Sequence, residues 1–178
     1  MKTTLTSNGS RKALAALAAL ALGITGLVGC SSPSDELVER VTEELVEAGG
    51  DGNVDVDIND ESMTITDDEG NEMAIGEGAS IPDTWPSDVP LFESGSVVMS
   101  TVQPDVAASA VWETDASVED AAAAYDTQLT DAGFTLDQDA AVAGVIIRGY
   151  SSAAMTLSVS ISDEGGTTTL TVAAAMNE

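Results

Sequence analysis

The 178-residue sequence contains no histidine, and lysine does not occur after Lys12. Histidine is the usual general base of enzymes and the commonest transition-metal ligand, so its absence removes both roles. A serine nucleophile needs an adjacent base, and the chain beyond residue 12 offers neither histidine nor lysine. Paired carboxylates could act on glycans, but no pair stands out, and with 3% aromatic residues few rings could line a sugar cleft. The sequence therefore predicts a protein that is not an enzyme and needs no cofactor.

Positive charge is also scarce. The chain after Cys30 carries two arginines, Arg40 and Arg148, against all 31 acidic residues, which gives it a formal charge of −29. A surface this acidic repels phosphate backbones and anionic lipid headgroups, so nucleic acid is excluded as a partner. The acidity is interpreted as solvation of an exported, salt-exposed protein, with loose association of divalent cations as the alternative.

The sequence contains one long hydrophobic run. Residues 13–28 are almost entirely Ala, Leu and Gly, and they follow the positive residues Lys2, Arg11 and Lys12. This order is typical of an export signal. The run is shorter than the roughly 20 residues that a membrane span needs. Residues 1–29 are therefore predicted to be a cleaved signal peptide.

Cysteine occurs once, at Cys30, so an internal disulfide is impossible. Leu27, Val28, Gly29 and Cys30 resemble the bacterial lipobox. The resemblance implies that the thiol receives a diacylglyceryl group, that signal peptidase cuts before Cys30, and that further acylation, such as palmitate, completes the lipoprotein. Two or three acyl chains hold a protein firmly at a membrane. The predicted location is the outer face of the cytoplasmic membrane.

Residues 30–52 combine the lipidated cysteine, a polar spacer and a short amphipathic helix. Leu37, Val41 and Leu45 recur every four residues until Gly49 and Gly50 end the pattern. This stripe could dock on its own domain or on a partner, or the helix could remain a partly mobile stalk. Residues 53–80 then alternate apolar and polar side chains with turn residues between, which predicts a small three-stranded β-meander.

Residues 81–95 form a proline-rich connector. Proline lacks an N–H and restricts the residue before it, so this segment interrupts both helical and strand periods. Trp85 within it is predicted to plug one end of a core rather than to bind a ligand.

Residues 96–178 predict an α+β sandwich domain, an antiparallel β-sheet with one helix packed across one face. A capping box at Ser117 to Asp120 begins the helix, Val118 to about Ala132 form it, and Gly133 ends it. A short strand at Phe134–Leu136 is expected next, followed by strands from Ala143 to Tyr150, Met155 to Ile161 and Thr167 to Ala174. The clearest is Met155 to Ile161, with one apolar and one Ser/Thr face. With so few aromatic residues, small and branched side chains are expected to form the core.

Several of these segments together resemble small secreted lipoproteins of actinobacteria and related Gram-positive bacteria. The similarity covers most of the chain after the signal: the lipobox, the charged helix, the Val-Asp-Val-Asp strand, the connector Pro-Asp-Thr-Trp-Pro-Ser-Asp-Val-Pro-Leu, and the helix from Ser-Val-Glu-Asp-Ala-Ala to Ala-Gly-Phe. This family has no assigned activity. The resemblance implies surface anchoring, no particular substrate, and no functional residue beyond Cys30.

A calcium loop is the one metal site that the sequence suggests. Asp55, Asp57 and Asn59 place oxygen ligands at alternate positions, as such loops do. The sixth position, however, is Asp60 where the sharp turn needs glycine, and the twelfth is Thr66 where a bidentate glutamate is needed. Alternating Val and Asp is also what a half-exposed strand produces, so no metal site is predicted.

Two classes of function remain. The first is a non-catalytic binding or interaction module of the cell envelope, which presents its sheet face, an edge strand or the Trp85 region to a partner. The alternative is a structural or cation-associating acidic surface protein.

Overall fold

The structure is a computed structural model that describes residues 54–58 and 62–177. The predicted signal peptide, Cys30 and the short amphipathic helix lie outside the described residues. The described part contains one helix and nine strands: β1 (Val54–Ile58), β2 (Ser62–Asp67), β3 (Glu72–Gly76), β4 (Ser96–Gln103), β5 (Ala107–Thr114), α3 (Val118–Asp131), β6 (Thr135–Val142), β7 (Val145–Ser151), β8 (Met155–Glu164) and β9 (Thr167–Met176).

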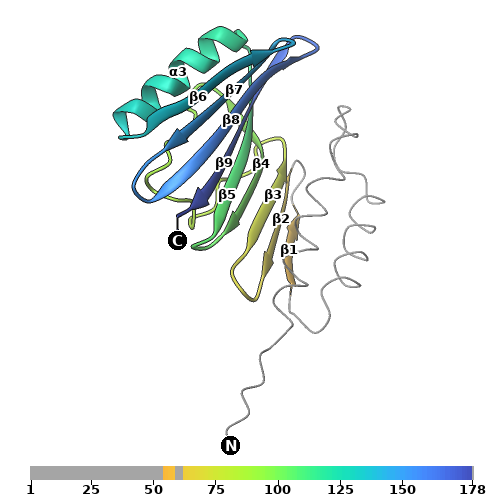
Figure 1. Cartoon of the computed structure of the whole chain (residues 1–178). Coiled ribbons are helices and arrows are strands. Elements are labelled where there is room, and N and C mark those ends of the chain that lie inside the picture. Colours follow the sequence, from red (N-terminus) through yellow and green to blue (C-terminus); the bar gives the residue numbers. More distant parts are fainter. Residues whose placement is uncertain (1–53, 59–61, 178) are drawn as a thin grey trace, which may run out of the picture. The chain divides into compact units, whose positions relative to one another are not determined.

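All nine strands belong to one antiparallel sheet in the order β1-β2-β3-β4-β5-β9-β8-β7-β6, and α3 lies over the end formed by β6 to β9 (Figure 1). The α+β class, the antiparallel sheet and the single helix across one face are thereby confirmed. The hydrogen-bonded ladder continues from β3 to β4, with Met73 opposite Thr101 and Ala74 opposite Ser100. The strands before the connector therefore extend the same sheet as the strands after it.

The helix ends follow local signals. The Ser117 hydroxyl accepts a hydrogen bond from the Asp120 backbone N–H at 3.1 Å and caps the first turn. In a full capping box the Asp120 carboxylate would accept the Ser117 backbone N–H. In this structure the carboxylate accepts a hydrogen bond from the Ser117 hydroxyl at 2.8 Å. At the other end Gly133 has φ +90°, a conformation that glycine adopts without strain.

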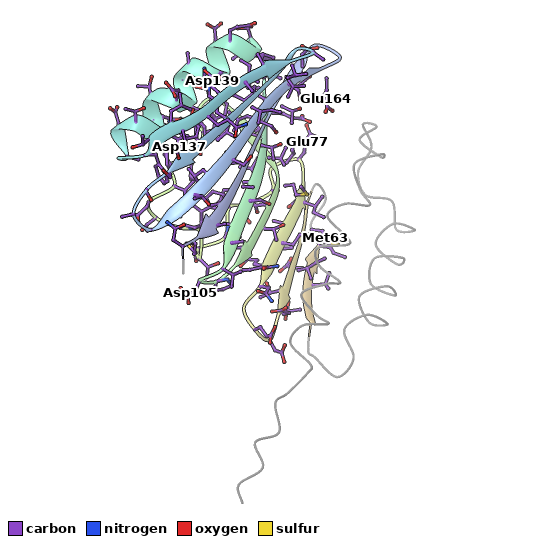
Figure 2. The ribbon with its side chains drawn as sticks, in the orientation of Figure 1. Met63, Glu77, Asp105, Asp137, Asp139 and Glu164 are labelled. Carbon is purple, nitrogen blue, oxygen red and sulfur yellow. The ribbon has the colours of Figure 1, made fainter. Side chains whose placement is uncertain are left out.

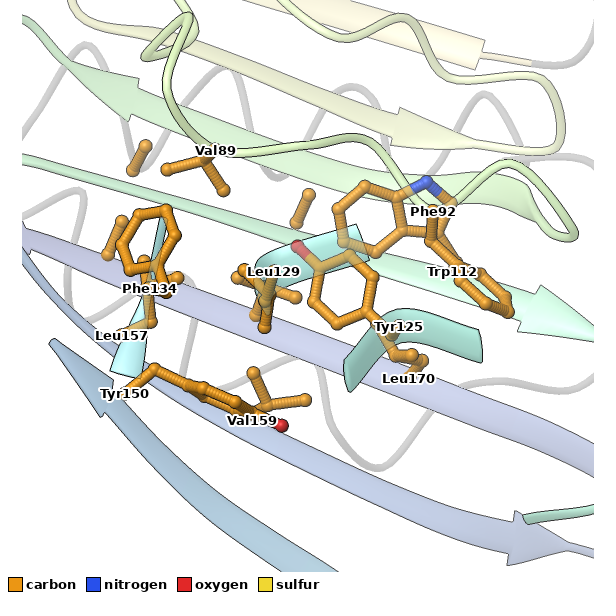
Figure 3. Close-up of a cluster of buried hydrophobic side chains, with 14 of the residues drawn as sticks. Val89, Phe92, Trp112, Tyr125, Leu129, Phe134, Tyr150, Leu157, Val159 and Leu170 are labelled. Atoms are coloured by element: carbon orange, nitrogen blue, oxygen red, sulfur yellow. The ribbon is translucent and has the colours of Figure 1, made fainter. Parts of the chain in front are cut away.

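The core lies between α3 and the sheet (Figure 3). Tyr125 and Leu129 of the helix are fully enclosed by inward-facing strand residues such as Trp112, Val159 and Leu170. All six aromatic residues of the sequence belong to this cluster or pack against it: Trp85, Phe92, Trp112, Tyr125, Phe134 and Tyr150. The expectation of a core of small and branched residues was therefore incomplete, because the few aromatic side chains are gathered in one place.

The connector closes one end of this core. Trp85 is partly buried, and its ring meets that of Trp112 edge-on at a centroid distance of 6.2 Å and an angle of 89°. Its indole N–H donates to the Val89 carbonyl at 3.0 Å, which holds the connector in a turn. Trp85 therefore packs against the core, as predicted.

The observed strand positions differ most from the predicted ones around the β6–β7 hairpin. The sequence indicated only a short strand at Phe134–Leu136 and began the next strand at Ala143, whereas β6 runs to Val142 and Ala143 lies in the turn. Ala143 (φ +53°) and Gly144 (φ +85°) form a two-residue turn that matches the twist of the paired strands. The polar, non-alternating stretch from Asp137 to Asp139 concealed this strand.

Candidate functional site

The predicted lipidation site cannot be placed in the fold, because Leu27, Val28, Gly29 and Cys30 lie outside the described residues. Of the calcium-loop residues, Asp55 and Asp57 lie on β1 with exposed side chains, and Asn59 is outside the described residues.

The backbone at Asp55 and Asp57 is a strand rather than a loop. Asp55 pairs with Thr66 and Asp57 with Thr64 in the β1–β2 ladder. Residues two apart on a strand are separated by about 6.6 Å along its axis, whereas a calcium loop curls so that its ligands converge on the ion. Within the described residues, His, Cys, Asp and Glu side chains nowhere gather in threes in a way that could hold a metal ion.

The structure instead brings together a charged cluster between α3 and the β6–β7 hairpin, formed by Arg148, Asp126, Asp139 and Tyr150. Arg148 Nη1 donates to the Ala122 carbonyl of α3 at 3.0 Å, and its Nε lies 3.4 Å from Asp139 Oδ1. Asp126 Oδ1 accepts the Tyr150 hydroxyl at 2.9 Å and lies 3.8 Å from Arg148 Nη1. Figure 2 shows Asp139 on β6 beside the helix.

This cluster joins three elements through the one basic residue of the described chain. Arg148 is 18% exposed, so most of its side chain is desolvated, whereas Asp126 and Asp139 keep 39% and 52% of theirs in solvent. Burial, followed by the hydrogen bond to Asp126, raises the pKa of Tyr150 to about 12, so its phenol is neutral and acts as a donor at physiological pH. The arrangement is suited to holding α3 on the sheet, because each polar group already has a partner.

We expect Arg148→Ala to lower the free energy of unfolding by about 1–3 kcal/mol, because hydrogen bonds from a charged donor are worth roughly that much. The exposed ion pair with Asp139 should contribute less than about 1 kcal/mol. Asp139→Ala and Asp137→Ala remove the same charge from β6, but only Asp139 contacts Arg148, so they form a matched pair. Urea denaturation measures the free energy of unfolding of the three variants. Equal stability of Arg148→Ala and wild type would contradict the assigned role.

An exposed apolar patch lies on the β6–β7 hairpin. The eight residues 140–147 include no charged side chain. The pairing of Ala140 with Ile147 and of Val142 with Val145 places these four on one face of the sheet, opposite α3. Val142 is 63% exposed and Ile147 37%. Two positive-φ residues keep the turn tight, so the hairpin presents these side chains on a defined scaffold.

Sequence reasoning missed both features, although signals for each were present. Arg148 stands two residues from Ile146 and two from Tyr150, so strand alternation places it on their inward face, where an arginine needs carboxylate or carbonyl partners. For the hairpin, Ala143-Gly144 between two apolar runs was the turn signal. The strand pattern alone left open which runs were buried.

No protein family, curated protein or solved structure matches the chain. Over residues 54–58 and 62–177, no helix is long and apolar enough to cross a membrane.

Proposed function

We propose that the protein is an extracytoplasmic lipoprotein, anchored to the outer face of the cytoplasmic membrane through acyl chains on Cys30. The observation that carries this proposal is the sequence Leu27-Val28-Gly29-Cys30 at the junction between a positive-then-apolar leader and an acidic body. The resemblance to small secreted lipoproteins of Gram-positive bacteria agrees with it. In the same proposal, a short helix in 30–52 follows the anchor, and the strands predicted as a meander in 53–80 are the first strands of the nine-stranded sheet.

The proposed role is that of a non-catalytic interaction module. The apolar patch at Val142 and Ile147 supports it, since exposed apolar side chains on a rigid hairpin are typical of surfaces that meet a partner. The alternative, a structural or cation-associating surface protein, rests on the charge of −29 after Cys30. Sodium chloride and calcium should then stabilise the domain alike, because either cation screens the acidic surface. Chemistry by paired carboxylates is the least favoured function.

Cys30→Ala should abolish incorporation of labelled fatty acid, because Cys30 carries the only thiol in the sequence. The variant should also retain its leader or reach the medium, since cleavage at a lipobox follows lipidation. Metabolic labelling and detergent partitioning of wild type and variant measure both effects. Ser31→Ala, one residue beyond the lipobox, is the matched control and should be labelled like wild type. Equal labelling of Cys30→Ala would refute the proposed location.

A photo-crosslinking residue at Val142 should capture a specific envelope partner in intact cells, because this side chain is the most exposed large apolar one in the described chain. The same residue at Ser158, which is exposed on the Ser/Thr part of the sheet, is the control. Mass spectrometry identifies the adducts. Identical adducts from both positions would favour the structural alternative over the interaction module.

A further inference from the structure

The free edge of β6 is open to solvent. β6 is the last strand in the sheet order and pairs only with β7, so no strand lies beside its other edge among residues 54–58 and 62–177. Seven of its eight residues are exposed, and none is a proline or a lysine, the residues that commonly shield such edges. A bulge between Leu136 and Gln138 interrupts the ladder, so the regular part of this edge runs from 138 to 142.

The turn after β6 determines which of its backbone groups point to this edge. The two-residue turn places Val142 and Val145 opposite each other as a hydrogen-bonded pair. Such pairs alternate along an antiparallel ladder with pairs whose backbone groups point outward. The N–H and C=O groups of Asp139 and Ala141 therefore point away from β7. They are the donors and acceptors that a further strand needs.

The two faces of the sheet differ in chemistry next to this edge. On the face opposite α3, Ala140 and Val142 lie beside Ile147 of β7 and belong to the exposed apolar patch described above. On the face that α3 covers, Asp139 and Asp126 keep 52% and 39% of their side chains in solvent. An added strand therefore meets apolar side chains on one face and carboxylates on the other.

Negative charge predominates at this edge even though Arg148 is close. Arg148 lies 3.8 Å from Asp126 and 3.4 Å from Asp139, and it is the one basic residue of the described chain. Asp137 adds a third carboxylate to β6, exposed on the same strand as Asp139 (Figure 2). Because opposite charges attract across an interface and like charges repel, this edge favours a basic strand over an acidic one.

We propose that β6 binds an extended segment of a partner protein, which adds to the sheet as a further antiparallel strand and alternates apolar with basic side chains. The inference rests on the interaction module proposed above and specifies its partner. Every strand pair of this sheet is antiparallel. Strand addition gains affinity from main-chain hydrogen bonds and specificity from alternate side chains. The apolar residues of the segment lie beside Val142 and its basic residues beside Asp139.

A second copy of the chain is a poorer partner for this edge. Pairing of β6 with β6 brings Asp137 and Asp139 of both copies together, and β6 has no basic side chain to compensate them. Each copy also carries −29 formal charge after Cys30, so two copies repel one another as they approach. A basic segment of another protein replaces this repulsion by attraction.

Synthetic peptides test the partner chemistry on the purified, unlipidated chain of residues 30–178. The probe is an octapeptide of alternating valine and lysine, and its control alternates valine and glutamate. The lysine peptide should bind at least about tenfold more tightly, because only it complements the carboxylates at the edge. Fluorescence anisotropy measures both affinities. Equal affinities, or no binding of the lysine peptide, would overturn the proposal.

Backbone methylation of the lysine peptide separates strand addition from attraction of charge alone. In an antiparallel pair, the residue opposite Asp139 directs its N–H toward β6 and its side chain to the face of Asp139, so it is a lysine. N-methylation of the lysines should therefore weaken binding at least about tenfold, whereas N-methylation of the valines should change it less than about twofold. An equal effect of the two modifications would refute strand addition.

Amide exchange provides the second measurement and localises the contact. The lysine peptide should slow exchange of the Asp139 and Ala141 amides, which point away from β7, and leave β4 unchanged. Protection of these amides without peptide that grows with protein concentration would overturn the proposal in favour of a second copy. If the peptide protects neither amide while Val142 captures a specific partner in cells, strand addition is refuted and the interaction module stands. Fatty-acid labelling of Cys30 is independent of both results.

Discussion

Between about pH 10 and 12 the free energy of unfolding should fall steeply as pH rises, and two tyrosines should account for the fall. The chain after Cys30 has no lysine, histidine or cysteine, and arginine stays charged in this range, so Tyr125 and Tyr150 are its only side chains that titrate there. Burial raises the pKa of both phenols. For Tyr150 it reaches about 12, with the hydrogen bond to Asp126 as the second cause.

The direction follows from proton binding. An unfolded tyrosine loses its proton near its ordinary pKa of 10, whereas the folded one retains it. In this interval the unfolded state therefore binds fewer protons, and each tyrosine lowers stability by up to about 1.4 kcal/mol per pH unit. The two together approach about 2.7 kcal/mol per pH unit, enough to unfold a domain of ordinary stability within a few units.

Tyr150→Phe isolates one of the two contributions. The variant should be less stable at neutral pH, because the hydrogen bond to Asp126 is lost, but its stability should fall with about half the wild-type slope at alkaline pH. Urea denaturation at intervals from pH 8 to 12 measures both slopes. If wild type and variant lose stability in parallel, Tyr150 is not desolvated in the folded protein.

Trp112→Ala should destabilise the domain by about 3–5 kcal/mol, the usual cost of deleting a large aromatic side chain from a core. Trp112 is 1% exposed and touches two further rings, Trp85 at 6.2 Å and Tyr125 at 6.5 Å. Its removal therefore leaves a cavity and also removes the ring against which Trp85 of the connector packs. Trp85→Ala should show part of the same loss, because Trp85 is only partly buried.

The matched control for Trp112 is its neighbour. Val111 is on the same strand but on the other face and is only half-buried, so Val111→Ala should cost less than about 1.5 kcal/mol. Denaturant midpoints of the two variants give the comparison. A Trp112→Ala variant as stable as Val111→Ala would show that the three rings do not form the packed unit described above.

The elements that sequence could predict are those determined by near neighbours. The helix Val118–Asp131 begins at a serine cap and ends at a glycine, both within a few residues of it. In β8, Met155, Leu157, Val159 and Ile161 are buried and their neighbours face solvent, as the alternation indicated. Such patterns need no knowledge of the rest of the chain.

The features that escaped prediction depend on distant parts of the chain. Arg148 finds its partners on α3 and β6, and nothing in the adjacent sequence specifies them. The pairing of β3 with β4 crosses the connector, so no local period could show that one sheet continues through it. The aromatic cluster likewise joins residues from the connector, β5, α3 and β7, which a count of aromatic residues could not reveal.

The strand order of the sheet has a consequence for how the protein folds. Every neighbouring pair of strands is consecutive in the chain except β5 and β9, so Thr114 must meet Thr168 across the whole of α3, β6, β7 and β8. Local hairpins close in microseconds, whereas the long loop adds an entropy cost that grows with its length. The strands β1–β5 on one side of this pairing and β6–β9 on the other can therefore pair early and independently of one another. We expect the β5–β9 seam to form last, so substitutions that weaken this seam should change the folding rate less than the unfolding rate.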